Sequence, residues 1–142
     1  MIEKCRFSWW LVLLAMVALA SCSASGPEQR LRERIGDMQQ ALEAREPATF
    51  MRGVAEDFGG RNGLDRAGVH NLLRVQMLRH QAIGATFGPL DIEIVGDRAT
   101  VKFTVLTTGG NGLIPERAQP WRVNSGWRDG SDGWQLIQAD WE

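Results

Sequence analysis

The apolar residues between about 27 and 80 recur at the three- and four-residue spacing of α-helices, in three separate stretches. The first stretch predicts a helix over 27–45 with a charged face opposite its apolar face. The second predicts a shorter helix that ends at Gly59-Gly60, and the third a helix that starts after Asp65 and ends near His80. The apolar positions are, in order, Leu31, Ile35, Met38 and Leu42; Phe50, Met51, Val54, Ala55 and Phe58; and Val69, Leu72, Leu73, Val75, Met77 and Leu78. We expect these faces to be buried.

After His80 the apolar period changes from helical to alternating, which is typical of half-buried strands. A two-residue turn at Gly96-Asp97 predicts a hairpin between the strands around 91–95 and 98–105. The register that places all apolar pairs on one side pairs Val95 with Arg98, Ile94 with Ala99, Ile92 with Val101, and Asp91 with Lys102. The ion pair then lies on the other side of the sheet.

Two further strands are predicted at the end of the chain, over 121–128 and 134–142, with a turn over 129–133. The glycine-containing segment 109–120 is interpreted as a loop or a strand interruption. Helices followed by antiparallel strands indicate an α+β fold, in which N-terminal helices pack on a curled antiparallel sheet.

The start of the chain has the pattern of a secretory signal: Lys4 and Arg6, and then an apolar run that ends in Leu19-Ala20-Ser21-Cys22. This end resembles the bacterial lipobox, in which the cysteine is acylated and the chain is cut before it. The alternatives are a signal cut elsewhere and a transmembrane helix, for which about 14 apolar residues fall short of the roughly 20 needed.

The lipobox resemblance divides the chain into a signal peptide (1–21), a lipidated tether (22–26) and a single domain (27–142). It implies a membrane anchor through the lipid on Cys22, in the bacterial cell envelope. Ser23, in place of an aspartate, resembles the sorting signal for the outer membrane, with the domain facing the periplasm.

Charge and cysteine content exclude several classes of function. Removing residues 1–21 takes Glu3, Lys4 and Arg6 from the 17 acidic and 16 basic side chains of the chain, which leaves a formal net charge of −2. No long basic run remains, so no nucleic-acid partner is expected. With Cys5 removed and Cys22 acylated, the domain has no disulfide and no thiol chemistry.

No metal site and no cofactor are expected. His70 and His80 lie ten residues apart on one predicted helix, about 15 Å along its axis, so they cannot share a metal ion. His80 is a weak candidate for a general base near a pocket. The alternative is that His80 has no catalytic role and lies near the C-terminus of its helix because the helix dipole favours a histidine there.

Three helices, a curled sheet and the closing run Asp132-Gly133-Trp134-Gln135-Leu136-Ile137 resemble the nuclear transport factor 2-like (NTF2-like) superfamily, a cone-shaped, cystatin-like fold shared with ketosteroid isomerases and polyketide cyclases. The resemblance implies a pocket between helices and sheet, and a homodimer through the outer sheet face. It implies no single activity. Ketosteroid isomerases use a tyrosine, and this chain contains none.

Asp140 is the main candidate for a catalytic or ligand-binding acid. Counting by two along its strand places Trp134, Leu136, Gln138 and Asp140 on one face, and the register predicted for the neighbouring strand brings Trp127 to Trp134 and Trp121 near Asp140. The candidate lining of a pocket for an apolar small molecule is Trp121, Ser125, Trp127, Trp134, Gln138 and Asp140. The alternative for Asp140 is an ion pair with Arg117 or Arg122 at the end of a strand.

Ile137, Ala139 and Trp141 are expected on the opposite face, as a dimer or helix-packing surface. Three functions follow as hypotheses: a non-catalytic binding or assembly domain on the membrane, a small isomerase, dehydratase or cyclase with an acid–base pair in the cone, and a scaffold without ligand. A filled cone favours assembly, and a hollow one with two facing ionisable groups favours the enzyme.

Overall fold

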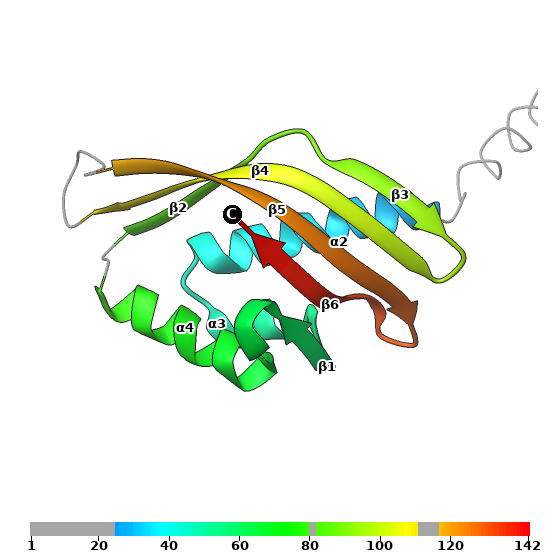
Figure 1. Cartoon of the computed structure of the whole chain (residues 1–142), viewed down its shortest axis with the longest axis horizontal. Coiled ribbons are helices and arrows are strands. Elements are labelled where there is room, and N and C mark those ends of the chain that lie inside the picture. The colour runs from blue at the N-terminus through cyan, green and yellow to red at the C-terminus, as the bar shows by residue number, and fades with distance from the viewer. Residues whose placement is uncertain (1–24, 80–81, 111–116) are drawn as a thin grey trace, which may run out of the picture.

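The computed structural model describes residues 25–79, 82–110 and 117–142. Helices come first along the chain and strands dominate the second half (Figure 1). The elements are α2 (Pro27–Glu43), α3 (Pro47–Met51), β1 (Val54–Gly60), the short 3-10 helix η2 (Arg61–Gly63), α4 (Arg66–Arg79), β2 (Ala82–Phe87), β3 (Asp91–Val95), β4 (Arg98–Gly110), β5 (Arg117–Gly130) and β6 (Gly133–Trp141). The α+β fold class predicted from the sequence is confirmed.

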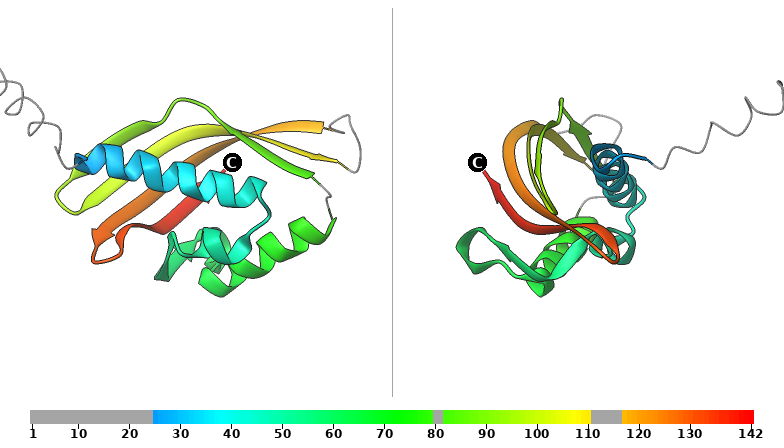
Figure 2. Two further views of the ribbon diagram at one scale, coloured as in Figure 1. Left: turned by 180° about the vertical axis from the view of Figure 1, so that it is seen from behind. Right: turned by 90° about the vertical axis from the view of Figure 1, so that its right-hand side faces the viewer.

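The strands form one six-stranded sheet in the order β1-β6-β5-β4-β2, and β3 pairs with β4 beside β2. All pairs are antiparallel except β1 with β6, which is parallel. The sheet curls around α2, as the end-on view shows (Figure 2). It is therefore mixed, whereas the sequence predicted an antiparallel sheet.

Helix α2 fills the hollow of the sheet with the face that its periodicity predicts, except that Ala41 is buried in its last turn and Leu42 is only half-buried. Leu31, Ile35, Met38 and Ala41 are its buried residues, and Leu31 has no exposed surface. The amide of Gln39 donates a hydrogen bond of 2.8 Å to the carbonyl of Ala85 on β2. This bond also covers part of the free edge of that strand, which would otherwise offer unpaired backbone groups.

The segment 50–58 is the clearest error of the sequence prediction. The helix expected there ends at Met51, and Val54–Gly60 is a strand. A side-chain Cβ at Gly53 would lie 2.3 Å from the sulfur of Met38, so a larger residue here would force the buried Met38 side chain to move. The carbonyl of Gly53 then accepts a hydrogen bond of 2.8 Å from the amide of Leu136 on β6. Pairing with β6 therefore decides between two structures that the apolar pattern alone leaves close.

The hairpin of β3 and β4 has the predicted register in all four pairs, from Asp91 opposite Lys102 to Val95 opposite Arg98. Gly96 adopts a positive φ of 62°, as the tight turn requires. Ala99 and Val101 face the core, with exposed fractions of 5% and 0%. The register therefore places the side chain of Lys102 on the outer face of the sheet, opposite to the core.

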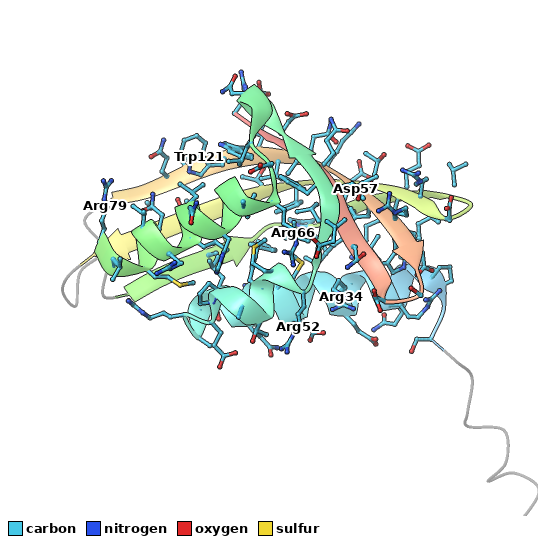
Figure 3. The ribbon with its side chains drawn as sticks, turned by 90° about the horizontal axis from the view of Figure 1, so that it is seen from below. Arg34, Arg52, Asp57, Arg66, Arg79 and Trp121 are labelled. Carbon is cyan, nitrogen blue, oxygen red and sulfur yellow. The ribbon has the colours of Figure 1, made fainter. Side chains whose placement is uncertain are left out.

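Helix α4 starts as predicted, because the carboxylate of Asp65 accepts a hydrogen bond of 2.8 Å from the amide of Gly68. Its predicted burial is wrong: of the six apolar residues expected to be buried, only Met77 is. Leu72, Val75 and Leu78 are 44%, 40% and 84% exposed. The reason is that α4 lies at the outside of the molecule, next to α3 and β1, with one face on the body of the domain (Figure 3).

Two strand segments were not predicted at all. Residues 82–87 form β2, which pairs along its whole length with β4. Strand β5 begins at Arg117, so residues 117–120 pair with β4 where a loop or an interruption was expected. The glycines and the proline that suggested a break, at 109–110 and 120, are tolerated at the ends of long strands near the edge of the sheet.

Candidate functional site

Three of the six side chains expected to line a pocket, Ser125, Trp127 and Trp134, instead fill the interior between sheet and α2. Trp127 and Trp134 are 4% and 1% exposed, and both belong to the main hydrophobic core. The indole N–H of Trp127 donates to the hydroxyl of Ser125 at 2.9 Å, and that hydroxyl donates to the carbonyl of Val101 at 3.0 Å. The indole N–H of Trp134 donates to the carbonyl of Pro27 at 2.9 Å. Their polar atoms are therefore already satisfied by protein groups.

The predicted pairing of β5 with β6 is wrong along its length, because only residues 131–132 separate the strands where a turn over 129–133 was predicted. A β-bulge then shifts the register once more, between Gly126 and Trp127. Trp127 pairs with Leu136, and Trp134 pairs with Asp129, whereas the sequence placed the two tryptophans opposite each other. Gly126 pairs with Gln138, so Ile137 is an extra residue on β6 between the two pairs. A bulge of this kind shifts the alternation of the strand by one residue.

The bulge moves the end of β6 to the other face. Gln138 is exposed, Ala139 is buried in the core and Trp141 packs against that core. Asp140 therefore lies on the outer face, away from Trp134. Of the two alternatives for Ile137, Ala139 and Trp141, a dimer surface or a helix-packing surface, the core position of Ala139 and Trp141 favours packing against α2. Trp121, opposite Val105, is not paired with the end of β6.

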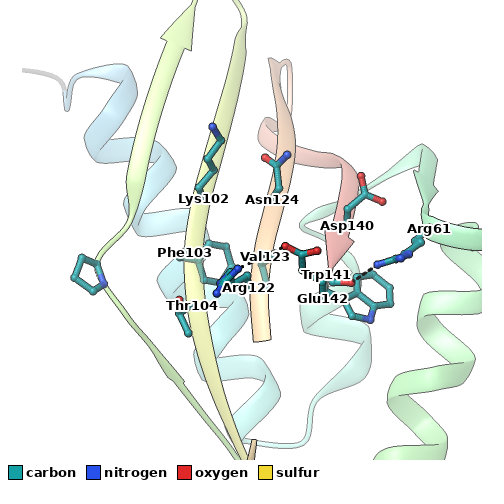
Figure 4. Close-up of a pocket in the computed structure, with 11 residues that line it drawn as sticks. Arg61, Lys102, Phe103, Thr104, Arg122, Val123, Asn124, Asp140, Trp141 and Glu142 are labelled. Carbon is teal, nitrogen blue, oxygen red and sulfur yellow. Dashed lines mark hydrogen bonds and ion pairs between the residues drawn. The ribbon is translucent and has the colours of Figure 1, made fainter. Parts of the chain in front are cut away.

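On the outer face, four polar side chains from neighbouring strands stand in one row. Asp91 on β3 pairs with Lys102 on β4, Lys102 with Asn124 on β5, and Asn124 with Asp140 on β6. Figure 4 shows Lys102, Asn124 and Asp140 side by side. We call Lys102, Asn124 and Asp140 the outer row. It borders an open groove of about 540 Å³, which is lined by Arg61, Pro89, Lys102, Phe103, Thr104, Arg122, Val123, Asn124, Asp140, Trp141 and Glu142.

From β4 to β6 the outer row presents a cation, an amide and a carboxylate, and Asp91 lies beyond Lys102 on β3. Within the described residues, the side chains of Lys102 and Asn124 form no hydrogen bond or ion pair, and Asp140 accepts one hydrogen bond of 3.2 Å from Gln138. Arg122 pairs with Glu142 at 3.9 Å, so it is not the partner of Asp140 that the alternative interpretation expected. The row can therefore offer a cation, an amide and a carboxylate to another molecule.

Arg61 closes the groove on the side of β1 and η2. Its guanidinium donates a hydrogen bond of 2.8 Å to the carbonyl of Trp141, near the end of β6 (Figure 4). The backbone of Arg122 and Glu142 is also paired, with N–O distances of 2.9 and 3.1 Å. These contacts fix the strand end that carries Asp140.

A second ion pair on the sheet surface joins β1 to β5 and has a structural role. The two oxygens of Asp57 on β1 accept hydrogen bonds of 2.9 and 2.7 Å from the guanidinium of Arg128 on β5. The pair spans β6, which lies between these strands. Hydrogen bonding to Arg128 lowers the pKa of Asp57, and the same contact raises the pKa of Arg128.

The sequence identified Asp140 and the polar placement of Lys102, but it missed Asn124. Lys102 could be found because the hairpin register is readable from the alternation of apolar residues. Asn124 becomes part of a row only through the register of β4 with β5, for which the sequence offered no turn. Two other predicted residues, His80 and Cys22, lie outside the described residues.

The described part of the chain contains no group of three or more histidine, cysteine, aspartate or glutamate side chains arranged to hold a metal ion. Among its helices, none is both long enough and apolar enough to cross a membrane.

No protein-family model and no curated protein matches the sequence. Solved structures do match the fold. An NTF2-like superfamily protein from Salmonella enterica has a TM-score of 0.70 at 14% identity, over 82% of this chain and 89% of that one. An NTF2-like protein of unknown function from Pseudomonas putida has a TM-score of 0.68 at 18% identity, over 79% and 82% of the two chains.

Bd1075 from Bdellovibrio bacteriovorus has a TM-score of 0.72 at 14% identity, over 80% of this chain. This chain spans only 40% of the length of that protein. At such identities the likeness concerns the fold alone. The domain therefore has the α+β, NTF2-like or cystatin-like fold, as its sequence resemblance implied.

Proposed function

We propose that this chain is a non-catalytic binding domain, held on the bacterial outer membrane by a lipid on Cys22, and that its outer row binds a small molecule carrying both charges. The observation behind this proposal is the contrast between the two faces of the sheet. Trp127 and Trp134 fill the interior with satisfied polar atoms, whereas Lys102 and Asn124 on the outer face have no partner among the described residues.

The same contrast favours binding over catalysis. Ser125 is the buried polar residue among those described, and both of its hydroxyl contacts are to protein groups. Acid–base catalysis in a closed cone requires an ionisable group that faces substrate inside the cone. Asp140 instead lies on the outer face next to Gln138, in an open groove.

The ligand class follows from the spacing of the outer row. Neighbouring strands lie about 4.8 Å apart, so Lys102 and Asp140 are about 10 Å apart at their Cα atoms. A short peptide with free termini fits this spacing: its carboxylate pairs with Lys102, its ammonium with Asp140, and an internal amide bonds Asn124. We therefore propose short zwitterionic peptides, in place of the apolar ligand that the sequence suggested.

Triglycine titrated into the full mature chain tests this ligand class, with tryptophan fluorescence as the readout because Trp141 lines the groove. N-acetyl triglycine and triglycine amide are matched controls, each lacking one charge. We expect saturable binding of triglycine alone, lost in Asp140→Asn and Lys102→Gln. Equal response to all three peptides, or binding unchanged in both variants, contradicts the proposal.

The membrane anchor has its own test. Mature protein isolated from the membrane fraction should carry Cys22 as an acylated N-terminal residue in the mass spectrum, and Cys22→Ala should leave the chain unprocessed at this position. Two or more acyl chains are needed for stable anchoring. An unmodified Cys22 in membrane-purified protein rules out the anchor but leaves the peptide titration valid.

A second copy of the chain is the other partner that the outer row suits. In such a homodimer the outer faces of the two sheets would stack around a two-fold axis that runs parallel to β5. Lys102 of each copy would then face Asp140 of the other copy, which gives two identical ion pairs. Sedimentation distinguishes this homodimer from the peptide site. Lys102→Asp should then dissociate the dimer, and adding Asp140→Lys should restore it. A monomer at all concentrations leaves the outer row free for a ligand.

A further inference from the structure

Arg61 continues the line of the outer row beyond Asp140. Gly60, at the end of β1, pairs with Ala139 on β6. The residues that follow these two are Arg61 and Asp140, and both line the groove. Because β1 and β5 flank β6 on opposite sides, Arg61 lies on the side of Asp140 that faces away from the rest of the outer row (Figure 4).

The charges of the groove leave Arg61 as a cation without an anion. Among the described residues that line the groove, Arg61, Lys102 and Arg122 are cationic, and Asp140 and Glu142 are anionic. Arg122 pairs with Glu142 at 3.9 Å. A zwitterionic peptide, bound as proposed above, takes Lys102 and Asp140 for its two termini. The complementary ligand therefore carries one further negative charge, at the end of the groove where Arg61 lies.

The guanidinium of Arg61 is held in place and still has donors to offer. One of its N–H groups donates to the carbonyl of Trp141 at 2.8 Å, and a guanidinium has five N–H donors in a rigid fork. Arg61 is exposed, and in the described part of the chain no ion pair joins it to an acidic side chain. A group that is fixed before binding loses less conformational freedom when a carboxylate arrives.

We infer that Arg61 selects peptides whose first residue is acidic. This inference rests on the proposed peptide site and adds a preference to it. With the peptide ammonium on Asp140 and the peptide running toward Lys102, the side chain of its first residue can reach Arg61. In an extended glutamate the ammonium nitrogen and the side-chain carboxylate lie about 5 Å apart, close to the roughly 4.8 Å between neighbouring strands. The two charges of an N-terminal glutamate therefore match Asp140 and Arg61.

Calorimetric titration of the full mature chain with three peptides tests this preference. Glu-Gly-Gly carries the acid on its first residue, Gln-Gly-Gly is the neutral peptide of the same shape, and triglycine is the reference. We expect Glu-Gly-Gly to bind about three- to fivefold more tightly than Gln-Gly-Gly, the gain of one well-placed exposed charge pair. The ratio of the two affinities should fall as salt is raised.

Two single variants separate contact with Arg61 from the general charge of the surface. In Arg61→Gln the preference should vanish, while triglycine binds as it does to the wild type. Arg98→Gln is the matched control, because Arg98 is exposed on the same face of β4 as Lys102 but does not line the groove. This variant removes the same charge about 13 Å away along the strand, and it should keep the preference.

The outcomes distinguish the preference from the site on which it rests. Equal affinity of the wild type for Glu-Gly-Gly and Gln-Gly-Gly, or an undiminished preference in Arg61→Gln, overturns the inference and leaves the peptide site standing. Loss of triglycine binding in Arg61→Gln also overturns it, since Arg61 would then serve to fix the end of β6. If none of the three peptides binds the wild type, the proposed peptide site is wrong and so is the preference.

Discussion

The two faces of strands β4, β5 and β6 are made by alternate residues of the same chain and differ in almost every physical respect. On the inner face, Val101, Ser125 and Trp127 touch one another and are at most 4% exposed. On the outer face, Lys102 and Asn124 are one residue away along the same strands, yet they are exposed and have no partner among the described residues. The inner positions hold the fold together, and the outer ones are available for recognition.

This difference separates stability from function in the molecule. A side chain with many close contacts cannot change without a cavity or an unpaired polar group. A side chain that faces water contributes little to folding, so its identity is free to serve binding. Each of the following substitutions measures how far the separation extends.

The largest effect is expected at Trp134. Its side chain is 1% exposed and its N–H is bonded to the carbonyl of Pro27, so Trp134→Ala removes both packing and a hydrogen bond. We expect a loss of about 3–5 kcal/mol in the free energy of unfolding, measured by reversible urea denaturation. Trp121→Ala is the control, since Trp121 is only partly buried, and it should cost less than half as much. Equal costs would mean that the interior is not the centre of stability.

The buried hydroxyl of Ser125 is expected to have the next largest effect. Ser125→Ala removes its donor to Val101 and leaves the indole N–H of Trp127 without an acceptor in the core. The cost should be about 1–3 kcal/mol, because a buried donor loses its partner.

Trp127→Phe provides the double-mutant cycle for this bond. In a background without the indole N–H, Ser125→Ala should cost less than in the wild type. Additive costs in the cycle would show that the two side chains do not act through their hydrogen bond.

The ion pair of Asp57 and Arg128 predicts a smaller effect that appears only in acid. Because the pKa of Asp57 is lowered in the folded state, its contribution is complete above the unfolded pKa, near 3.9, and is lost as the pH falls through the lowered value. The stability of the wild type should therefore drop more between neutral pH and pH about 3 than that of Asp57→Asn. Arg128→Gln should reduce the drop in the same way, and an unchanged pH dependence in both variants would exclude this pair as its source.

Much of the fold was predictable because apolar residues repeat with the period of each element. The apolar face of α2 and the register of the β3–β4 hairpin follow from spacing and from one glycine turn. Segment 50–58 was assigned wrongly because Val54, Ala55 and Phe58 fit a helix as well as a strand, and the pairing partner of β1 lies about 80 residues further on, at Leu136. No local pattern contains that partner.

The candidate site was predictable only in part. Asp140 was identified, but its face was not, because the extra residue Ile137 in β6 leaves no mark in an alternating sequence. Asp140 was therefore placed beside Trp134 in a pocket, while the structure places it on the outer face with Lys102 and Asn124. The burial of helix α4 was predicted wrongly for a related reason. Periodicity shows which residues are apolar, but it does not show whether another part of the molecule covers them.

The smallest effect on stability is expected in the outer row itself. Asp140→Asn keeps the size of the side chain, Lys102→Gln shortens it slightly, and both remove a charge. Among the described residues, the hydrogen bond at stake is the 3.2 Å one from Gln138 to Asp140. Each variant should change the free energy of unfolding by less than about 0.5 kcal/mol, because exposed side chains without close partners contribute little. Urea denaturation of both variants, beside Ser125→Ala from the inner face, measures this directly. A loss above about 1 kcal/mol would make the row a structural element of the sheet, and the loss of peptide binding in these variants could then not be assigned to recognition.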